Sequence, residues 1–511
     1  MTGLPVGWST VSLSEVAQPA GGGTPSKAEP GFWIGGDIPW VSPKDMKSPT
    51  ITDSEDHVTE AALDRLNLVP EGSVLVVVRS GILARTVPVA LNTVPVTINQ
   101  DLRAFIPGPA ILGAFMRWQL IACEREILDT CSKDGTTVAS LEGPALSSFQ
   151  LRLAPFREQE RIVGKIEELL SGLDDGVEEL RSAQAKLQNY RQSILKAAVE
   201  GELTADWRAI NDPAETGAQL LDRILGERRI WWRADREAKA RASRKPLTRG
   251  WEAKYEEPVA ADTAGLPALP VSWAWATIGQ LTRDSSYGTS VKCDANFSGV
   301  PVLRIPNVSR EQVDLRNLKF SGVDLGLHES DFLEPGDVLV IRTNGSIGLV
   351  GRAAAIAAQL PGPYYFASYL LRLRMVERTR THLWLSACLA SPWGRRWLEG
   401  RAASSAGQHN ISLSTLLTMP IPLPPVEEQD QVLSELESAI GTADRLYEAS
   451  ELPMKQCIAQ RQNILRAAFS GQLVPQDPAD EPADALLARI RASRSVTKPP
   501  ARRRSEEHTS E

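Results

Sequence analysis

Two sets of polar and basic side chains, one in each half of the chain, are of the types that bind nucleic acid. They lie in turn or loop contexts and comprise Lys44, Arg79, Ser80, Asn99 and Gln100 in the first half and Arg304, Asn307, Arg342, Asn344 and Tyr369 in the second. Arg hydrogen-bonds guanine and Asn or Gln hydrogen-bonds adenine in the DNA major groove, while Lys and Ser hold phosphates. Each residue taken alone is better explained as a solvated loop residue. Their occurrence as two sets favours DNA binding.

Recognisable catalytic motifs are missing from the sequence. It contains no G-x-G-x-x-G, no phosphate loop ending in G-K-[ST], no H-E-x-x-H and no Asn/Asp-Pro-Pro-Tyr/Phe tetrapeptide. The Gly-rich loop at 21–26 lacks the Lys-Ser/Thr ending, so we interpret it as a tight turn or a close backbone approach to a ligand. The five histidines show no metal-ligand spacing, and we predict neither a metal nor a cofactor. A recognition or scaffold protein is therefore favoured over an enzyme.

Length and composition narrow the class of protein further. A chain of 511 residues is too long for one hydrophobic core, which predicts two to four domains. Five scattered cysteines and the lack of a long apolar run make a reduced cytoplasm the simplest location. The net charge of −7 argues mildly against a general nucleic-acid binder. It still permits a local basic surface, and the Arg- and Lys-rich stretch at 228–249 either grips phosphates or is a solvated helix and linker.

Two mixed α/β domains are expected to hold the two sets of side chains. Leu4-Pro5-Val6-x-Trp8 at the start of the first domain returns as Leu269-Pro270-Val271-x-Trp273, at an offset of 265 (269 − 4). A Pro-Gly turn before a buried strand returns at an offset of 264 (333 − 69). Between residues 21 and 70, and between 284 and 333, no convincing alignment is visible. The two domains thus share a framework but differ in their variable surface.

A long helix is predicted to follow the first domain, at residues 155–201. Its apolar residues recur at alternating steps of four and three, from Ile162 to Ala197, which is the heptad spacing of a helix that packs lengthwise on another helix. The fixed φ of Pro155 suits the helix start, and Gly201 suits a left-handed C-cap. A helix of this length requires a partner.

The partner is a near copy of this helix later in the chain, at residues 425–471. The paired motifs are Glu158-Gln159 with Glu428-Gln429, Arg191-Gln192 with Arg461-Gln462, and Gly201-x-Leu203 with Gly471-x-Leu473. Each pair has an offset of 270 (428 − 158, 461 − 191, 471 − 201), so no net insertion separates them. Pro453 falls on the apolar seam of the copy and predicts a kink there.

The predicted division of the chain has six parts. They are a first domain at 1–153, a first long helix at 154–203, a short helix and basic linker at 204–265, a second domain at 266–423, a second long helix at 424–473 and a C-terminal segment at 474–511. The tail from Lys498 is rich in Pro and Arg and predicts disorder. Its last eight residues resemble a translated sequencing adapter, so the natural C-terminus is an open question.

The doubled helix motif resembles the specificity subunits of type I restriction–modification systems. The residues that carry the resemblance are Pro-x-x-Glu-Gln at each helix start, Arg-Gln-x-Ile-Leu-x-Ala-Ala-x-x-Gly-x-Leu at each helix end, and Leu-Pro-Val-x-Trp at each domain start. The resemblance covers the chain to about residue 490. It implies an α+β fold with two mixed α/β target recognition domains, separated by two long helices packed as an antiparallel coiled coil, and a pseudo-twofold internal repeat.

The resemblance also implies a function and partners. Each domain would read one half of a split, asymmetric site in double-stranded DNA, and the helices would set the half-site separation. Two methyltransferase subunits would dock on the helices and methylate adenine, and restriction motor–nuclease subunits would cleave DNA with ATP. The helix residues assigned to docking or spacing are Glu158, Gln159, Arg191, Gln192, Glu428, Gln429, Arg461 and Gln462. Two alternatives stay open: a DNA methyltransferase or nuclease with an unrecognised motif, and a coiled-coil scaffold.

Overall fold

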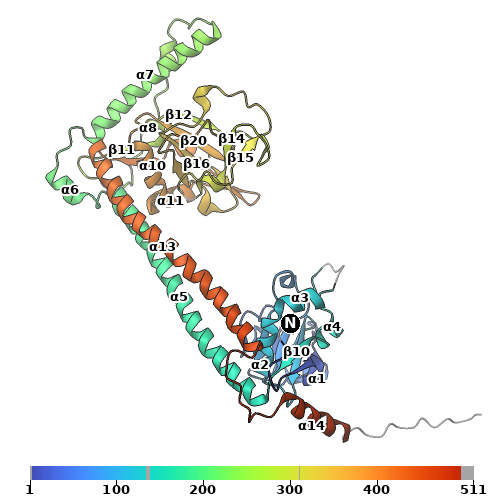
Figure 1. The fold of residues 1–511 in the computed structure, drawn as a ribbon. Coiled ribbons are helices and arrows are strands. Elements are labelled where there is room, and N and C mark those ends of the chain that lie inside the picture. Colours follow the sequence, from blue (N-terminus) through green and yellow to red (C-terminus); the bar gives the residue numbers. More distant parts are fainter. Residues whose placement is uncertain (1–2, 134–137, 310, 497–511) are drawn as a thin grey trace, which may run out of the picture. The chain divides into compact units, whose positions relative to one another are not determined.

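The computed structural model describes residues 3–133, 138–309 and 311–496, which form two compact units. Unit 1 combines residues 1–181 with 451–511, and unit 2 is the continuous segment 182–450. Each unit contains one mixed α/β domain and one half of each of two long helices (Figure 1). The loop expected at 135–137 and the disordered tail expected from Lys498 lie outside the described residues.

The domain of unit 1 is built on a five-stranded sheet. Its central strand carries Val-Leu-Val-Val, all buried, as expected for a strand covered on both faces. The strand order is β2(Ala17–Gly21), β9(Leu102–Pro107), β6(Val74–Val77), β7(Val89–Asn92), β4(Thr50–Ile51). Two smaller sheets have the orders β5(Asp56–Val58), β3(Ile38–Val41), β8(Thr97–Ile98) and β1(Ser9–Ser12), β10(Gln150–Leu153). The helices are α1(Leu13–Val16), α2(Gly113–Ala122), α3(Glu124–Cys131) and α4(Gly143–Ser147).

The domain of unit 2 repeats this architecture. Its main sheet has the order β12(Thr282–Tyr287), β20(Leu370–Met375), β16(Asp337–Ile341), β18(Ala353–Ala355). The smaller sheets are β13(Cys293–Asp294), β15(Lys319–Ser321), β14(Pro301–Leu303), β19(Tyr365–Phe366); β11(Ala274–Thr277), β23(Pro420–Leu423); and β17(Thr343–Asn344), β22(Gln408–Asn410), β21(Ala403–Ser405). The helices are α8(Ile278–Leu281), α9(Ile305–Val308), α10(Thr381–Ala390), α11(Pro392–Glu399) and α12(Leu413–Leu417).

Strand pairing extends the repeat into the segments where the sequence shows no alignment. In unit 1, β3 pairs in parallel with β8 and antiparallel with β5. In unit 2, β14 pairs in parallel with β19 and antiparallel with β15. The two domains therefore share this second sheet as well as the main one. These strands are two to four residues long, so they leave little periodicity in the sequence.

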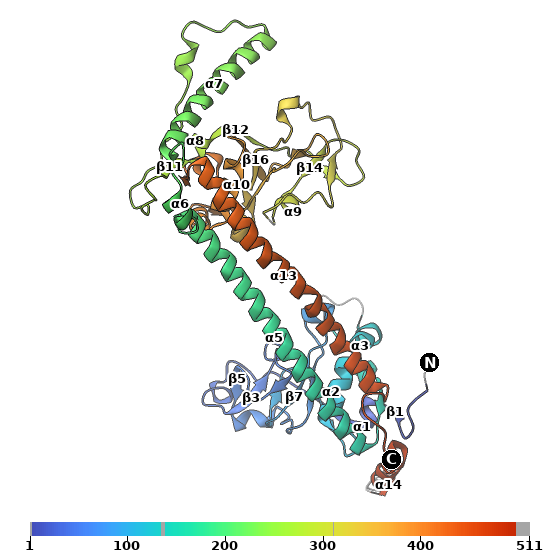
Figure 2. The same cartoon turned by 60° about the vertical axis from the view of Figure 1, so that its left-hand side comes forward.

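The two long helices are α5(Phe156–Glu200) and α13(Val426–Phe469), and they lie side by side within each unit (Figures 1 and 2). Arg461 contacts Asp174 at 2.8 Å in unit 1, while Gln184 contacts Ser450 at 2.7 Å and Arg191 contacts Asp444 at 3.0 Å in unit 2. The residue numbers of the two partners add up to 635 in two of these contacts and to 634 in the third. A constant sum means that the helices run antiparallel in one register. The predicted antiparallel pair is confirmed.

Two details of the helices were predicted from the sequence. Gly201 and Gly471 follow the helix ends with φ of 76° and 72°, the left-handed conformation expected for a C-cap. The second helix continues through Pro453, which lies three residues from the boundary between the units at 450/451, and the kink expected there stays a prediction. None of the helices in the described part of the chain is long and apolar enough to cross a lipid bilayer.

Three further helices follow the ends of the long ones. After α5 come α6(Ala205–Ile210) and α7(Gly217–Ser243), and after α13 comes α14(Ala483–Val496). The sequence predicted a short helix and a basic linker at 204–265, with a solvated helix as one interpretation of the basic stretch, and α7 has 27 residues that include most of that stretch. Helix α14 was not predicted.

The unpredicted helix α14 is the counterpart of α7. Gly217 N donates to Ser272 O at 2.7 Å, and Ala483 N donates to Gly7 O at 2.9 Å. The offsets of the two donors and the two acceptors are 266 (483 − 217) and 265 (272 − 7). The repeat therefore runs from the Leu-Pro-Val-x-Trp segment through the helix that follows each long helix.

Candidate nucleic-acid interface and helix joints

In unit 1, the strand ends bring four of the five predicted residues into one patch. Arg79 follows β6, and its Nε lies 3.8 Å from Asp101 Oδ1. The Asn99 amide is buried and makes two bonds with Asp101, from Asn99 Nδ2 to Asp101 Oδ2 (3.3 Å) and from Asp101 N to Asn99 Oδ1 (3.0 Å). Exposed Gln100 accepts a hydrogen bond from Thr24, and Ser80 caps the turn after Arg79. Arg79 and Gln100 are the side chains that face solvent here.

The fifth predicted residue of this set, Lys44, belongs to the loop after β3. It is exposed and forms ion pairs with Glu55 at 3.0 Å and Asp56 at 2.9 Å. The hydrogen bonds to Asp56 and Glu55 raise the pKa of Lys44. Because surface ion pairs exchange readily with other anions, Lys44 can still contact a phosphate.

In unit 2, the corresponding strand ends carry an aromatic and basic patch. The Arg342 guanidinium lies 4.8 Å from the centroid of the Tyr287 ring, and its Nε donates to Asn410 Oδ1 at 3.3 Å. Arg342 N donates to the carbonyl of Tyr369, whose side chain is 58% exposed. Asn344, which is partly exposed, accepts a hydrogen bond at Oδ1 from Ser346 N at 2.8 Å. Tyr287 and Asn410 were not predicted from the sequence, because they come from segments 55 (342 − 287) and 68 (410 − 342) residues away from Arg342.

Arg304 directly precedes the short helix α9 and Asn307 lies within it, and the base-reading role predicted for Asn307 needs a correction. Asn307 is 2% exposed, and its Nδ2 donates to the carbonyls of Asp314 at 2.7 Å and Arg316 at 3.1 Å. Arg304 Nη2 donates to Asn317 O at 2.9 Å. The Asn307 amide therefore holds the 314–317 loop and is not free to reach a base.

The Gly-rich loop of unit 1 lies against the protein's own strand. A Cβ on Gly22 would lie 2.2 Å from the carbonyl oxygens of Ile98 and Asn99, and a Cβ on Gly288 would lie 2.3 Å from Phe366 O. Both glycines thus allow the segment that directly follows β2 or β12 to approach the segment before β9 or β20. The close approach expected for this loop is to the chain itself, and it positions the patch residues that follow.

The repeated spacing of the helix motifs is explained by two buried joints between helices and domains. Trp8 Nε1 donates to Glu158 Oε2 at 3.1 Å in unit 1, and Trp273 Nε1 donates to Glu428 Oε2 at 2.8 Å in unit 2. Both glutamates are at most 1% exposed. Gln159 bonds to the carbonyls of Ala110 and Ala154 and to the amide of Leu112, and Gln429 to the carbonyl of Pro424.

The burial of these four helix residues bears on their predicted role in docking or spacing. Since they are buried at the helix starts, they present no surface to a partner. We therefore assign Glu158, Gln159, Glu428 and Gln429 to fixing each helix on its domain.

Each joint also receives the end of the other long helix. A Cβ on Gly201 would lie 2.6 Å from Pro270, and a Cβ on Gly471 would lie 2.4 Å from Pro5. The three repeated motifs therefore meet at one place in each unit: the Leu-Pro-Val-x-Trp segment, the start of one long helix and the end of the other.

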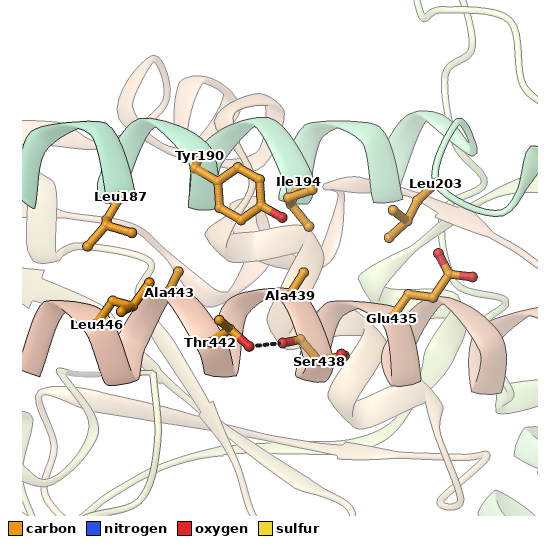
Figure 3. Close-up of a pocket in the computed structure, with 10 residues that line it drawn as sticks. All are labelled: Leu187, Tyr190, Ile194, Leu203, Glu435, Ser438, Ala439, Thr442, Ala443 and Leu446. Atoms are coloured by element: carbon orange, nitrogen blue, oxygen red, sulfur yellow. Dashed lines mark hydrogen bonds between the residues drawn. The ribbon is translucent and has the colours of Figure 1, made fainter. Parts of the chain in front are cut away.

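The remaining four helix residues, Arg191, Gln192, Arg461 and Gln462, are partly or fully exposed. Arg191 binds Asp444 and Glu311, Arg461 binds Asp174, and Gln192 and Gln462 are exposed. In unit 2 a groove of about 600 Å³ opens between α5 and α13, because one wall consists largely of small side chains (Figure 3). Tyr190 and Leu446 at this groove are 47% and 55% exposed. The helix pair thus offers an incompletely filled seam. In the described part of the chain, no group of His, Cys, Asp and Glu is arranged to hold a metal ion.

Comparisons with known proteins agree with this geometry. Residues 5–180 match the family model "Type I restriction modification DNA specificity domain". The EcoR124I/EcoR124II specificity subunit of Escherichia coli is 38% identical over 195 residues, which are 37% of this chain and 48% of that protein. The StySPI specificity subunit of Salmonella potsdam is 23% identical over 71% of this chain and 68% of its own length. The chain thus spans about half the length of the first of these two relatives.

A solved structure supports the fold. A chain from a study of complex assembly and conformational transition of the type I restriction–modification system aligns with 92% of this chain and 100% of its own, with a TM-score of 0.60 and 17% identity. This likeness in fold covers both repeats, whereas the family model covers the first. Residues 5–180 are thus similar to the DNA specificity domain of type I restriction–modification systems, and the chain shares the fold of that solved structure.

Proposed function

We propose that the protein is the DNA-recognition subunit of a type I restriction–modification complex and reads a split, asymmetric site in double-stranded DNA. The observation that carries this proposal is the pair of patches at equivalent strand ends of two domains with one architecture. The first patch offers Arg79 and Gln100 beside the Asp101 carboxylate, and the second offers Arg342 and Tyr369 beside the Tyr287 ring. Because the two patches differ in charge and aromatic content, the two half-sites differ in sequence.

The chemistry of each patch fits base reading in the major groove. Arg342 is held over Tyr287 and by Asn410, which fixes its guanidinium before DNA arrives. A pre-oriented guanidinium can donate two hydrogen bonds to the O6 and N7 of guanine. Gln100 can bond adenine in the same manner, while Lys44 and Ser80 suit phosphates.

Catalysis belongs to partner subunits in this proposal. The chain directs adenine methylation by two methyltransferase subunits and ATP-dependent cleavage by motor–nuclease subunits. The open seam between α5 and α13, with exposed Tyr190, Leu446 and Gln192, supports docking of such partners on the helices.

Sequencing of methylated adenines tests the proposal directly. The chain and its methyltransferase partner are expressed in a host without other adenine methylation, and a split motif with two different halves is expected. Methyl transfer by the purified chain alone, given S-adenosylmethionine and DNA, would overturn the division of labour. No motif with all components present would overturn the function.

One substitution tests the reading role of a single residue. Arg342→Gln should relax one base position in one half-site and cost about 1–3 kcal/mol of discrimination there. Arg304→Gln is the matched control, since Arg304 serves its own loop. Equal effects of the two substitutions would remove Arg342 from the interface.

The spacer role of the helices is tested by a paired deletion. Residues 173–179 of α5 lie opposite residues 456–462 of α13 in the antiparallel register (635 − 179 and 635 − 173). Removing both heptads keeps the register and shortens the pair by about 10 Å. The half-site separation should fall by about three base pairs, at about 3.4 Å per pair, with the bases unchanged. A change in bases at constant separation would contradict the spacer role.

A further inference from the structure

The arm formed by α7 and the segment that returns along it leaves the domain of unit 2 (Figures 1 and 2). The first two turns of α7 anchor the arm, because Leu220 and Ile224 are fully buried in the domain core. Beyond Ile224 no described residue of α7 is buried. A helix of 27 residues is about 40 Å long, so most of its length lies outside the core.

Aromatic contacts fasten the returning segment to the helix. The rings of Trp232 and Trp251 stack with centroids 5.4 Å apart, and Trp232 meets Tyr255 edge to face at 5.2 Å. Arg228 Nη1 donates to the Tyr255 hydroxyl at 2.7 Å. The arm is thus a closed hairpin with its own small aromatic core.

The part of the arm near the domain has neutralised charges. Arg223 pairs with Glu215 and Glu227, Arg229 with Glu257, and Arg233 with Glu252. Arg283 of the domain lies over the exposed Trp231 ring at 4.3 Å. These cations already have partners within the protein.

The far end of the arm, residues 236–254, is different. It has seven Lys or Arg residues and two Glu residues, a net charge of +5 in a chain whose total is −7. Lys239 pairs with Asp235, and the other six cations form no ion pair with any described residue. All six are exposed: Arg236, Arg241, Arg244, Lys245, Arg249 and Lys254. We call these six residues the arm tip.

The arm tip is also hollowed. A pocket of about 270 Å³ lies between the end of α7 and the returning segment, with Trp232 and Trp251 in its wall and Arg236, Lys245 and Lys254 among its lining residues. Arg236 lies 5.5 Å above the Trp232 ring, which orients its guanidinium. Negative groups are favoured at this concave, cationic surface.

We propose that the arm tip is a second DNA-binding site, which holds the phosphates of duplex DNA without reading bases. The six exposed Lys and Arg side chains of the arm tip have no anionic partner among the described residues, and such cations suit phosphate contacts. The centre of a protein–protein interface is depleted of charged residues, whereas Arg236, Lys245 and Lys254 all line this pocket. The proposal rests on the proposed function, because it presumes that DNA is bound by the two domains.

The test uses the complete complex of this chain with its methyltransferase partner. One variant carries Arg241→Gln, Arg244→Gln, Lys245→Gln and Arg249→Gln, and the matched control carries Arg241→Lys, Arg244→Lys and Arg249→Lys. The dissociation constant for a duplex containing the methylated motif is measured between about 50 and 300 mM salt. The slope of log Kd against log salt should fall by about one for each phosphate that the Gln variant no longer binds. The Lys variant should keep the slope of the unchanged complex, and both variants should methylate the same motif.

The outcomes separate the two proposals. An unchanged salt slope in the Gln variant, with the motif intact, would overturn the arm site and leave the proposed function standing. Dissociation of the methyltransferase from the Gln variant during gel filtration would show that the arm binds a protein and would also overturn it. A changed motif would overturn the claim that the arm holds DNA without reading bases. If the unchanged complex yields no split motif, the proposed function itself fails.

Discussion

The two helix joints are built from the same motifs but treat their buried glutamate differently. In unit 2 the Glu428 carboxylate accepts from Trp273 and Thr204 and forms an ion pair with Arg208, which also donates to Gly201 O at 2.7 Å. In unit 1 Glu158 Oε2 accepts from Trp8, and its Oε1 has no hydrogen-bond partner among the described residues.

One residue that differs between the two repeats explains part of the contrast between the partners of Glu158 and Glu428. At the helix offset of 270, Val474 stands where Thr204 supplies a hydroxyl (474 − 204). Arg161, whose charge acts on Glu158, is itself paired with Asp480. Burial raises the pKa of Glu158, and the Trp8 bond and Arg161 oppose the shift only in part. A repeat can therefore keep a contact while changing its electrostatic balance.

The largest expected effect separates the two glutamates. Glu428→Gln leaves Arg208, whose side chain is 21% exposed, without its anion, and should cost about 3 kcal/mol of unfolding free energy. That loss corresponds to a fall of about 6 to 12 °C in the melting temperature of unit 2. Scanning calorimetry checks it, with Glu158→Gln as the matched variant. Equal losses in the two variants would show that the joints are electrostatically alike.

Replacement of the joint tryptophans should affect stability in the opposite order, with the larger loss in unit 1. Trp8→Phe removes the indole hydrogen bond to the Glu158 carboxylate and should cost about 2 kcal/mol, as expected for an unsatisfied buried charge. Trp273→Phe leaves Thr204 and Arg208 on Glu428 and should cost about 1 kcal/mol. Denaturant midpoints of both variants give the comparison. A larger loss at Trp273 would contradict the ordering.

The pH dependence of the unit 1 joint provides a finer test. Because the pKa of Glu158 is raised above its value in the unfolded chain, the folded state holds more protons between the two values. Its stability contribution is therefore greatest below the unfolded pKa and is lost as pH rises through the folded pKa. Glu158→Gln should be as stable as the unchanged chain or up to about 1 kcal/mol more stable at about pH 7, and this advantage should vanish near about pH 4. Melting temperatures of Glu158→Gln and of the unchanged chain across this pH range test the expectation. If the stability advantage of the variant grew on acidification, the raised pKa of Glu158 would be refuted.

The smallest expected effect compares the two arginines on the long helices. Arg461 and Asp174 are 45% and 61% exposed, so Arg461→Ala should change stability by about 0.5 kcal/mol or less. Arg191 bridges Asp444 and Glu311 in a less exposed setting, and Arg191→Ala should cost about 1 kcal/mol. Thermal unfolding at low and high salt measures both. Equal stability losses in Arg461→Ala and Arg191→Ala would mean that the lower exposure of the Arg191 ion pairs does not make them stronger.

Much of the fold could be predicted because its signals are local and periodic. The apolar seam from Ile162 to Ala197 and the 270-residue offset of Glu158-Gln159 define two paired helices without a structure. The helix α14 escaped prediction, although Leu486, Leu487 and Ile490 repeat Leu220, Leu221 and Ile224 at an offset of 266 (486 − 220). That signal is only three residues long and lies beyond the obvious motif.

The candidate site could be predicted in part only. The sequence indicated Arg79, Arg342 and Tyr369 by type and turn context, and the structure places them at equivalent strand ends. It could not show that the amides of Asn99 and Asn307 turn inward, because the direction of a side chain depends on strands that meet only in the fold. Tyr287 and Asn410 were missed because they reach Arg342 from distant segments.

The discontinuous composition of unit 1 has a consequence for synthesis on the ribosome. Unit 2 is one continuous segment, and its 269 residues (450 − 181) separate the first part of unit 1 from its last part. At about 5–20 residues per second, the first domain waits roughly 15 to 60 s for Leu465, Phe469 and Leu486, which complete its core. During that interval the docking surface for these residues is uncovered. The half of the protein that is translated first is thus the last to close.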